Sequence, residues 1–182
     1  MESSLHFRIA SPADATAVHH LVEGAFRTQD SRTDWTGSAE LAHSFRLDLA
    51  DVEARIANPE IVTLVVHNQD SVMVGTIQVS KRGSGYGRLS MIAVDDRYQR
   101  SGVGTQILAF AENYCRKVWG VEKFSLNALS TRKALMEWYI RHGYRKVGET
   151  RPFPRDDFPE LELPDDLCFV ELEKDFPGDL AH

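Results

Sequence analysis

The sequence predicts an α/β or α+β protein built on a mixed β-sheet. In the first half, three apolar segments are separated by short polar turns, which predicts an antiparallel arrangement of strands. In the second half, amphipathic helices alternate with short strands, and two strands joined through a helix are expected to lie parallel and side by side. A glycine-containing loop precedes the longest of these helices, and this loop is a candidate binding site.

The N-terminal half is expected to hold a short strand at residues 6–10 and then a helix. Ser11-Pro12-Ala13-Asp14 has the features of a helix start: a serine N-cap, a proline in the first turn and a carboxylate three residues after the serine. The apolar residues that this helix should turn inward are Ala17, Val18, Leu21, Val22 and Phe26. The other expected elements are a polar loop at 29–37, a helical region at 41–57, strands at 61–67, 72–82 and 89–94, and a turn or mobile loop at 83–87.

The C-terminal half is expected to begin with a long amphipathic helix from Gly102 to Val118, which Gly120 ends. Its inward residues are predicted to be Ile107, Leu108, Ala111 and either Tyr114 or Cys115. The remaining expected elements are a strand at 124–126, a helix at 131–142, and strands at 144–150 and 168–173. With no internal repeat and no low-complexity linker, residues 1–182 are interpreted as a single domain with a core from about 6 to 175.

Composition excludes several classes of function. The chain has 182 residues and a net charge of −6, and no basic stripe suggests nucleic-acid binding. No apolar run approaches the roughly 20 residues needed to span a bilayer, so no membrane association is expected. The two cysteines and the absence of a secretory signal fit a cytoplasmic protein. The seven histidines are scattered, so no metal site is predicted. An acidic surface suits a cationic partner such as an amine.

The loop before the long helix has the features of an anion site. The first N–H groups of a helix lack internal partners, and the helix dipole adds partial positive charge there. Gly102 and Gly104 would let a pyrophosphate approach the backbone closely, while Arg97 and Arg100 could add charge. A bare Gly-x-Gly is equally compatible with a loop that merely tolerates glycine before an ordinary helix.

The sequence around Gly102 matches neither of two common nucleotide-binding motifs. A Walker loop requires Gly-x-x-x-x-Gly-Lys-Ser/Thr, and no such Lys-Ser/Thr pair follows Gly102. A dinucleotide fingerprint requires Gly-x-Gly-x-x-Gly after the first strand, but the sixth position is Ile107 and the motif lies in the middle of the chain.

The loop is more informative about function when it is considered together with the strand that precedes it. The strand Leu89–Val94 is followed by Gln99-Arg100-Ser101-Gly102-Val103-Gly104-Thr105, which resembles the Q/R-x-x-G-x-G/A segment of the GNAT superfamily of N-acetyltransferases. The resemblance extends over roughly His6 to Asp175. It implies acetyl-CoA as co-substrate and a mixed, largely antiparallel sheet of six to seven strands, with helices on both faces and a splay between strands 4 and 5.

By the same resemblance, the loop and the helix start hold the pyrophosphate of coenzyme A through backbone amides. The residues with this implied role are Gln99, Arg100, Ser101, Gly102, Val103, Gly104 and Thr105. The backbone of Ile92, Ala93 and Val94 would pair with pantetheine, and one of these N–H groups could polarise the thioester carbonyl. Arg132 stands where many members have a cofactor-contacting asparagine, and it could reach a phosphate or simply face solvent.

A second segment, Trp138 to Tyr144, resembles the family's aromatic-Tyr-x-x-x-Gly-aromatic pattern. Tyr139 aligns with the tyrosine that protonates the leaving thiolate in many members, a role that a phenol can fill. Taken without the resemblance, it is an aromatic residue of the core or rim. Asn127 stands where some members carry a glutamate base, and it is expected to position the substrate or a water.

The general base is left open. Glu40, Asp48, Tyr86 and His142 are possible contributors, and each is equally compatible with an ordinary surface position. Cys115 is expected to be a buried apolar thiol rather than a nucleophile. The acidic stretch 156–166 is either a solvated loop or a rim that attracts cationic amines.

The expected function is therefore that of an acyltransferase, which moves an acetyl group from acetyl-CoA directly to a primary amine of a small molecule. The alternatives are a protein or peptide acetyltransferase acting on N-termini or lysines, and a non-catalytic acyl-CoA-binding regulatory module. A homodimer is possible, because the C-terminal strand could pair between subunits.

Overall fold

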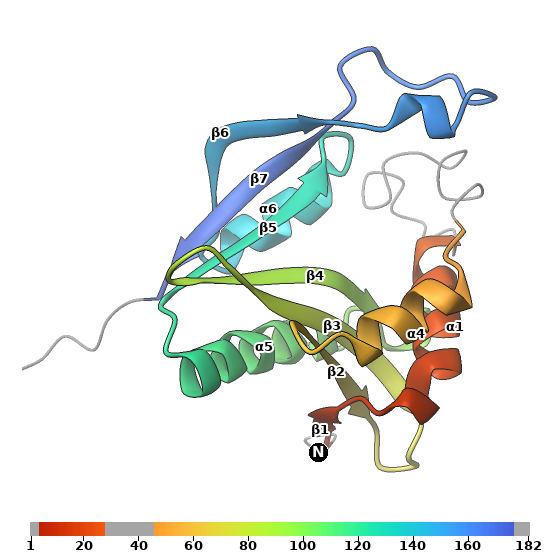
Figure 1. Ribbon diagram of the computed structural model, residues 1–182, viewed down its shortest axis with the longest axis vertical. Helices are drawn as coiled ribbons and strands as arrows, with labels where there is room; N and C mark the ends of the chain where they lie inside the picture. Colours follow the sequence, from red (N-terminus) through yellow and green to blue (C-terminus); the bar gives the residue numbers. More distant parts are fainter. Residues whose placement is uncertain (1–3, 28–45, 177–182) are drawn as a thin grey trace, which may run out of the picture.

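All strands of the described chain belong to one seven-stranded sheet in the order β1-β2-β3-β4-β5-β7-β6. A computed structural model describes residues 4–27 and 46–176 (Figure 1). The expected loop at 29–37, the first part of the helical region at 41–57 and the candidate base Glu40 lie outside the described residues. Neighbouring strands are antiparallel except β4 and β5, which confirms the mixed, largely antiparallel sheet.

The elements follow the expected order. From the N-terminus they are β1 (His6–Ile9), a 3-10 turn η1 (Pro12–Asp14), α1 (Ala15–Arg27), α4 (Leu49–Ala57), β2 (Ile61–His67), β3 (Met73–Arg82) and β4 (Tyr86–Val94). They continue with η2 (Asp96–Tyr98), α5 (Val103–Trp119), β5 (Lys123–Leu129), α6 (Lys133–Arg141), β6 (Arg145–Pro152), η3 (Arg155–Asp157) and β7 (Cys168–Asp175).

Four strands (β4, β5, β6 and β7) are longer than the sequence predicted, and the differences are largest in β4 and β5. β4 begins at Tyr86 rather than at Leu89, so Gly87 lies in a strand and not in a turn. A Cβ at Gly87 would lie 3.0 Å from the Cys115 sulfur of α5, which is a tight contact, so glycine favours close packing of the helix here. β5 runs from Lys123 to Leu129 and so extends beyond the apolar residues from which it was predicted.

Helices cover both faces of the sheet, as predicted (Figure 1). On one face, α5 and α6 pack over the larger apolar cluster, which includes Ile107, Leu108 and Phe124. On the other face, α1 and α4 pack over a smaller cluster that includes Val18, Val52 and Val65. One expectation for α1 was wrong: Ala15 is buried there and Ala17 is exposed.

β4 and β5 separate along their length, which is the predicted splay. They pair in parallel only from Tyr86–Lys123 to Arg88–Ser125. Beyond this point β4 carries a bulge, where Ser90 pairs with Gln78 and Ala93 with Thr76, so that two residues of β4 stand opposite the single residue between them on β3. Met91 lies in this bulge with a φ of 49°, an uncommon conformation for a side chain other than glycine.

The bulge also changes which side chains face each helical layer. Leu89 belongs to the cluster under α5, whereas Ala93, four residues later, packs in the cluster under α1. In a regular strand, residues four apart point to the same face. The extra residue therefore reverses the alternation and bends the strand, which opens the sheet beside β5.

β7 lies between β5 and β6, so it is paired along both edges within its own chain. The sheet therefore offers β1 and β6 as its edges, and not the C-terminal strand. This removes the physical basis on which pairing of the C-terminal strand between subunits was predicted.

A carboxylate locks the entry into α1. Asp14 accepts hydrogen bonds from both terminal nitrogens of Arg8, each at 2.7 Å, and from the Ser11 backbone N–H at 2.7 Å. The Arg8 hydrogen bonds are the main reason that the pKa of Asp14 falls from 3.8 to about 2. The expected helix start is confirmed, and the arginine of β1 adds to it.

Replacing Asp14 by asparagine should reduce the free energy of unfolding by about 1–2 kcal/mol at neutral pH. Because the folded-state pKa is depressed, this contribution is complete above pH 4 and is lost as the pH falls toward about 2. Urea unfolding of wild type and Asp14→Asn at several pH values measures the difference. Asp70→Asn, in an exposed turn, is the matched control. A difference independent of pH would contradict this explanation.

Candidate active site

A cavity of about 340 Å³ opens at the splay, between β4, the glycine-containing loop and α6. All the residues predicted to bind the cofactor line it, except Ser101 and Val103. Its walls are formed by Ala25, Phe26, Ile92, Ala93, Val94, Gln99, Arg100, Gly102, Gly104, Thr105, Arg132, Leu135 and Trp138. The two exceptions have other side-chain contacts: Ser101 donates its hydroxyl to the Tyr98 carbonyl, and Val103 is buried in the core.

The loop is shaped by local hydrogen bonds and unusual backbone angles. Asp95 caps the 3-10 turn η2 and binds the Arg97 guanidinium at 2.9 and 3.0 Å. Arg97 is therefore engaged by its neighbour and does not line the cavity, which leaves Arg100 as the loop arginine that does. Gln99 donates to the Val94 carbonyl at 3.3 Å and so connects the loop to the end of β4.

The two glycines of the loop serve different purposes. Gly102 is the N-cap of α5 and has a φ of +83°, which strains any side chain. Gly104 lies within the helix, where an added Cβ would make ordinary contacts with Trp138 at 3.4 Å and Val94 at 3.8 Å. The fold alone does not require glycine at 104. Its missing side chain keeps the cavity floor open, next to the helix N-terminus where an anion would be stabilised.

A second cavity of about 320 Å³ continues through the splay. It shares Phe26, Ile92, Arg132 and Leu135 with the first cavity. Its other walls include Ser90 and Met91 of β4, Asn127 of β5, Tyr139 of α6 and Phe169 of β7. The two cavities therefore meet at the strand edge of β4, with the glycine loop on one side and both predicted catalytic residues on the other.

Tyr139 is buried, with 3% of its surface exposed, and lines the second cavity. Burial raises the pKa of its phenol to about 12, while the positive charge of Arg132 acts in the opposite direction. The phenol is therefore protonated at neutral pH, which is the form that a proton donor needs.

Arg132 lies at the junction of the two cavities, at the N-cap of α6. Its guanidinium stands 5.3 Å from the ring centre of Phe26, and burial lowers its pKa from the ordinary value. An arginine remains charged even so. It thus supplies positive charge to the region where both cavities open.

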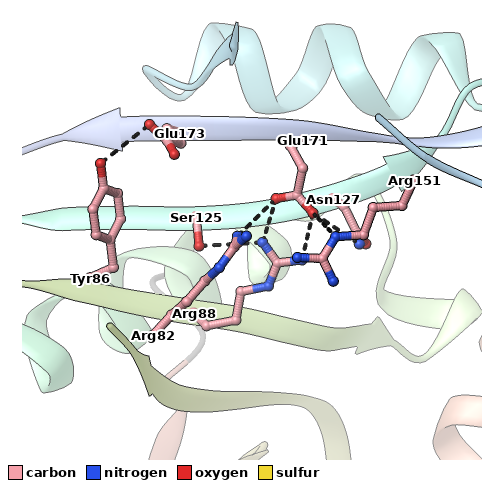
Figure 2. A network of polar contacts seen from close by, with 8 residues as sticks. All are labelled: Arg82, Tyr86, Arg88, Ser125, Asn127, Arg151, Glu171 and Glu173. Atoms are coloured by element: carbon pink, nitrogen blue, oxygen red, sulfur yellow. Dashed lines mark hydrogen bonds and ion pairs between the residues drawn. The ribbon is translucent and has the colours of Figure 1, made fainter. Parts of the chain in front are cut away.

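Asn127 contacts a buried carboxylate, Glu171, that was not predicted from the sequence. Its amide nitrogen donates to Glu171 at 3.5 Å, and Glu171 is 1% exposed on the neighbouring strand β7 (Figure 2). Burial acts to raise the pKa of Glu171, but hydrogen bonds and charge from Arg88 and Arg82 outweigh it, so the pKa lies below its usual value. A carboxylate held ionised in this way is a poor proton acceptor.

The candidate bases lie elsewhere. Tyr86 donates to Glu173 at 3.5 Å, at the paired end of β4. The Nδ1 atom of His142 faces the Trp138 carbonyl at 2.7 Å and therefore donates to it, so in the neutral ring Nε2 accepts from Thr105 at 3.1 Å. Together with Asp48, the N-cap of α4, these residues are absent from the walls of both cavities. The structure thus brings none of the three to the splay.

Other features of the described residues bear on chemistry. Cys115 is fully buried, and burial raises its thiol pKa to about 12, so it packs as the sequence predicted. Within residues 4–27 and 46–176, no three His, Cys, Asp or Glu side chains form a group that could hold a metal ion. In the same ranges no helix has both the length and the apolar character required to cross a bilayer.

Comparison with solved structures shows which fold this is. The PaiA N-acetyltransferase of Thermoplasma acidophilum, in complex with coenzyme A, superposes with a TM-score of 0.70 at 18% identity, over 95% of this chain and 99% of that one. The ribosomal-protein-S18-alanine N-acetyltransferase of Escherichia coli gives 0.69 at 16% identity, over 98% and 99%. A spermidine N-acetyltransferase chimera that includes the Vibrio cholerae enzyme gives 0.67 at 12% identity, over 95% and 96%.

Sequence comparison identifies the family. No curated protein sequence matched this chain. The family model of the acetyltransferase (GNAT) domain matches residues 33–155, which is more than half of the chain. Enzymes of this family use acetyl-CoA, and the splayed sheet with its glycine loop is the corresponding fold. The chain therefore belongs to the GNAT acetyltransferase family and is an acyltransferase.

Proposed function

We propose that this enzyme transfers an acetyl group from acetyl-CoA directly to a primary amine of a small molecule, at the junction of the two cavities. One observation carries the proposal: the cavity beside the glycine loop and the cavity that holds Tyr139 and Asn127 share a wall at Ile92, Arg132 and Leu135. A thioester lying along β4 would therefore present its carbonyl to an amine that enters from the second cavity.

The first cavity suits the coenzyme. Backbone N–H groups from Arg100 to Thr105 bind its pyrophosphate at the N-terminus of α5, while Arg100 and Arg132 add positive charge. The strand edge at Ile92, Ala93 and Val94 pairs with pantetheine, because β5 has already separated from β4 there. The side chain of Gln99 holds the loop against that edge through its hydrogen bond to Val94.

The reaction requires positioning and proton transfer. The neutral amine attacks the thioester carbon, the carbonyl oxygen takes up negative charge, and an N–H of β4 stabilises it. When the C–S bond breaks, the electron pair leaves with sulfur, and Tyr139 donates its proton to the thiolate. Asn127 orients the amine or a water, and the excess proton of the amine passes to water, from which Tyr139 regains the proton that it gave up.

The acceptor could instead be a protein or peptide. Among the similar structures, one is named for a ribosomal-protein alanine and another for spermidine, so this fold accommodates both kinds of acceptor. A small acceptor is favoured by the second cavity, which is bounded on several sides by α1, α5, α6 and four strands. Both cysteines are free thiols, which fits action in the reducing cytoplasm.

Thiol release from acetyl-CoA distinguishes these acceptors. The assay uses polyamines, aminoglycosides, amino acids and short peptides at equal concentrations. Release with small amines and not with peptides is expected. Release with peptides alone would replace the small-molecule acceptor by a protein one.

Removing the Tyr139 hydroxyl should lower kcat about 100-fold, because thiolate expulsion loses its proton donor. The KM for acetyl-CoA should change little, since Tyr139 does not line the first cavity. Steady-state kinetics of Tyr139→Phe measure both constants. Undiminished turnover at saturating substrate would remove Tyr139 from the mechanism.

Tyr144→Phe is the matched control for this experiment. Tyr144 is also buried, 5.9 Å from the Tyr139 ring, but its hydroxyl donates to Glu112 at 3.1 Å and lines neither cavity. We expect it to destabilise the fold by roughly 1–2 kcal/mol while kcat stays near the wild-type value.

Substitutions at Gly104 should separate coenzyme binding from folding. Gly104→Ala is expected to keep coenzyme A affinity within about threefold and to leave stability equal or slightly higher, because alanine favours the helix by up to about 1 kcal/mol. Gly104→Leu should fill the cavity floor and weaken binding at least roughly tenfold. Calorimetric titration with coenzyme A and thermal unfolding measure the two effects. Wild-type affinity in Gly104→Leu would contradict the assignment of this cavity.

A further inference from the structure

Three arginines from three strands converge on the single carboxylate of Glu171 (Figure 2). Arg88 of β4 binds both carboxylate oxygens, at 2.7 and 3.1 Å. Arg82 of β3 donates to one oxygen at 3.1 Å, and the Nε atom of Arg151, on β6, lies 3.8 Å from the other. Glu171 is thus surrounded by guanidinium groups, which explains how a carboxylate can be 1% exposed and remain charged.

The positive charge of this cluster exceeds its negative charge. Three guanidinium groups against one carboxylate leave an excess of two positive charges. Glu173, the next carboxylate on this face, accepts a hydrogen bond from Tyr86, and counting it still leaves an excess of one. Among the described residues, Glu171 is the ion-pair partner of both Arg82 and Arg151. Their side chains are 36% and 59% exposed, so both can take a further anion.

The cluster adjoins the second cavity. Leu129, Phe169 and Arg151 stand opposite one another on adjacent strands, and residues paired in this way point to the same face of a sheet. Leu129 and Phe169 line the cavity, and so does Asn127, which donates to Glu171. The side chain of Arg151 therefore lies next to these cavity-lining residues, on the face that carries α1 and α4, opposite α5 and α6.

We propose that the acceptor of this acetyltransferase carries a carboxylate beside its amine, and that Arg151, assisted by Arg82, binds this carboxylate. The inference rests on the proposed function and names its substrate class: amino acids and related amino carboxylates. Arg88 holds Glu171 in place. Glu171 in turn orients the guanidinium groups of Arg82 and Arg151, which bind the carboxylate of the substrate. Asn127 then stands between this anion site and the thioester.

The chemistry of the arginine side chain favours this ligand. A guanidinium is planar, always charged and matched to the two oxygens of a carboxylate. In Arg151 the Nε atom faces Glu171, which leaves the two terminal nitrogens for another group. One hydrogen bond to a charged partner in a partly enclosed site corresponds to roughly ten- to hundredfold in affinity.

The test compares each amino acid with its own carboxamide as acceptor. The pair differs in one negative charge and keeps the amine and the side chain. Thiol release from acetyl-CoA should give a kcat/KM at least tenfold higher for the carboxylate than for the amide. Equal values for both members of the pairs that turn over, or turnover confined to polyamines and aminoglycosides, would overturn the inference and leave the proposed function standing.

The Arg151→Gln variant tests whether Arg151 itself binds the carboxylate of the acceptor. It should raise KM for the carboxylate acceptor about tenfold or more, with little effect on the amide, so that the preference is lost. Arg145→Gln is the matched control, because Arg145 is also an exposed arginine of β6 but pairs with Asp175 at 3.2 Å, away from Glu171. An Arg151→Gln enzyme that keeps the wild-type preference would overturn the role of this residue.

A binding measurement separates failure of the subsite from failure of the proposed function. The wild-type complex with coenzyme A is titrated with N-acetylglycine and with N-acetylglycinamide, which are product-like probes that require no turnover. Tighter binding of the carboxylate, lost in Arg151→Gln, supports the subsite even where no amine of the panel is acetylated. Equal affinities would overturn it in either case.

Discussion

The parting of β4 from β5 is the constraint on which both cavities depend. Paired strands leave no room between them, and here the pairing stops after Arg88 and Ser125. The bulge at Met91 bends β4 away and reverses its alternation of faces, so the strand edge from Ile92 to Val94 borders a cavity instead of a neighbouring strand. The strained φ of Met91 is the local cost of that opening, and the packing of β4 between α1 and α5 maintains it.

The polar cluster around Glu171 lies where the strands are still joined. Arg88 belongs to the last pair before the splay, and it reaches across β5 to a carboxylate on β7. Removing one partner of such a buried pair leaves an uncompensated charge, which costs several kcal/mol. The cluster therefore resists separation of β4 from β7 at this end and confines the opening to the other end. The two outer arginines of this cluster, Arg82 and Arg151, stay partly exposed.

The sequence predicts what is encoded locally. Ser11 and Asp14 mark a helix start, Gly102 marks the loop before α5, and apolar runs mark the strands, because each depends on residues a few positions apart. Long-range pairing is different. No local signal places β7 between β5 and β6, and without that placement Glu171 cannot be brought to Asn127. Arg97 shows that a local contact can also remove an expected role. Its guanidinium pairs with the neighbouring carboxylate of Asp95 and therefore does not bring its positive charge to the cavity.

Net charge and local charge lead to different expectations about the acceptor. The chain carries −6 overall, which by itself favours a cationic amine. That sum is spread over the surface and is screened within about 10 Å at ordinary ionic strength. Beside the splay the balance is reversed, because Arg82, Arg88 and Arg151 surround a single carboxylate. An acceptor is recognised by the groups that it touches, and the acceptor proposed here would touch Arg151 and Arg82, so the local excess of positive charge favours an amine that brings its own anion.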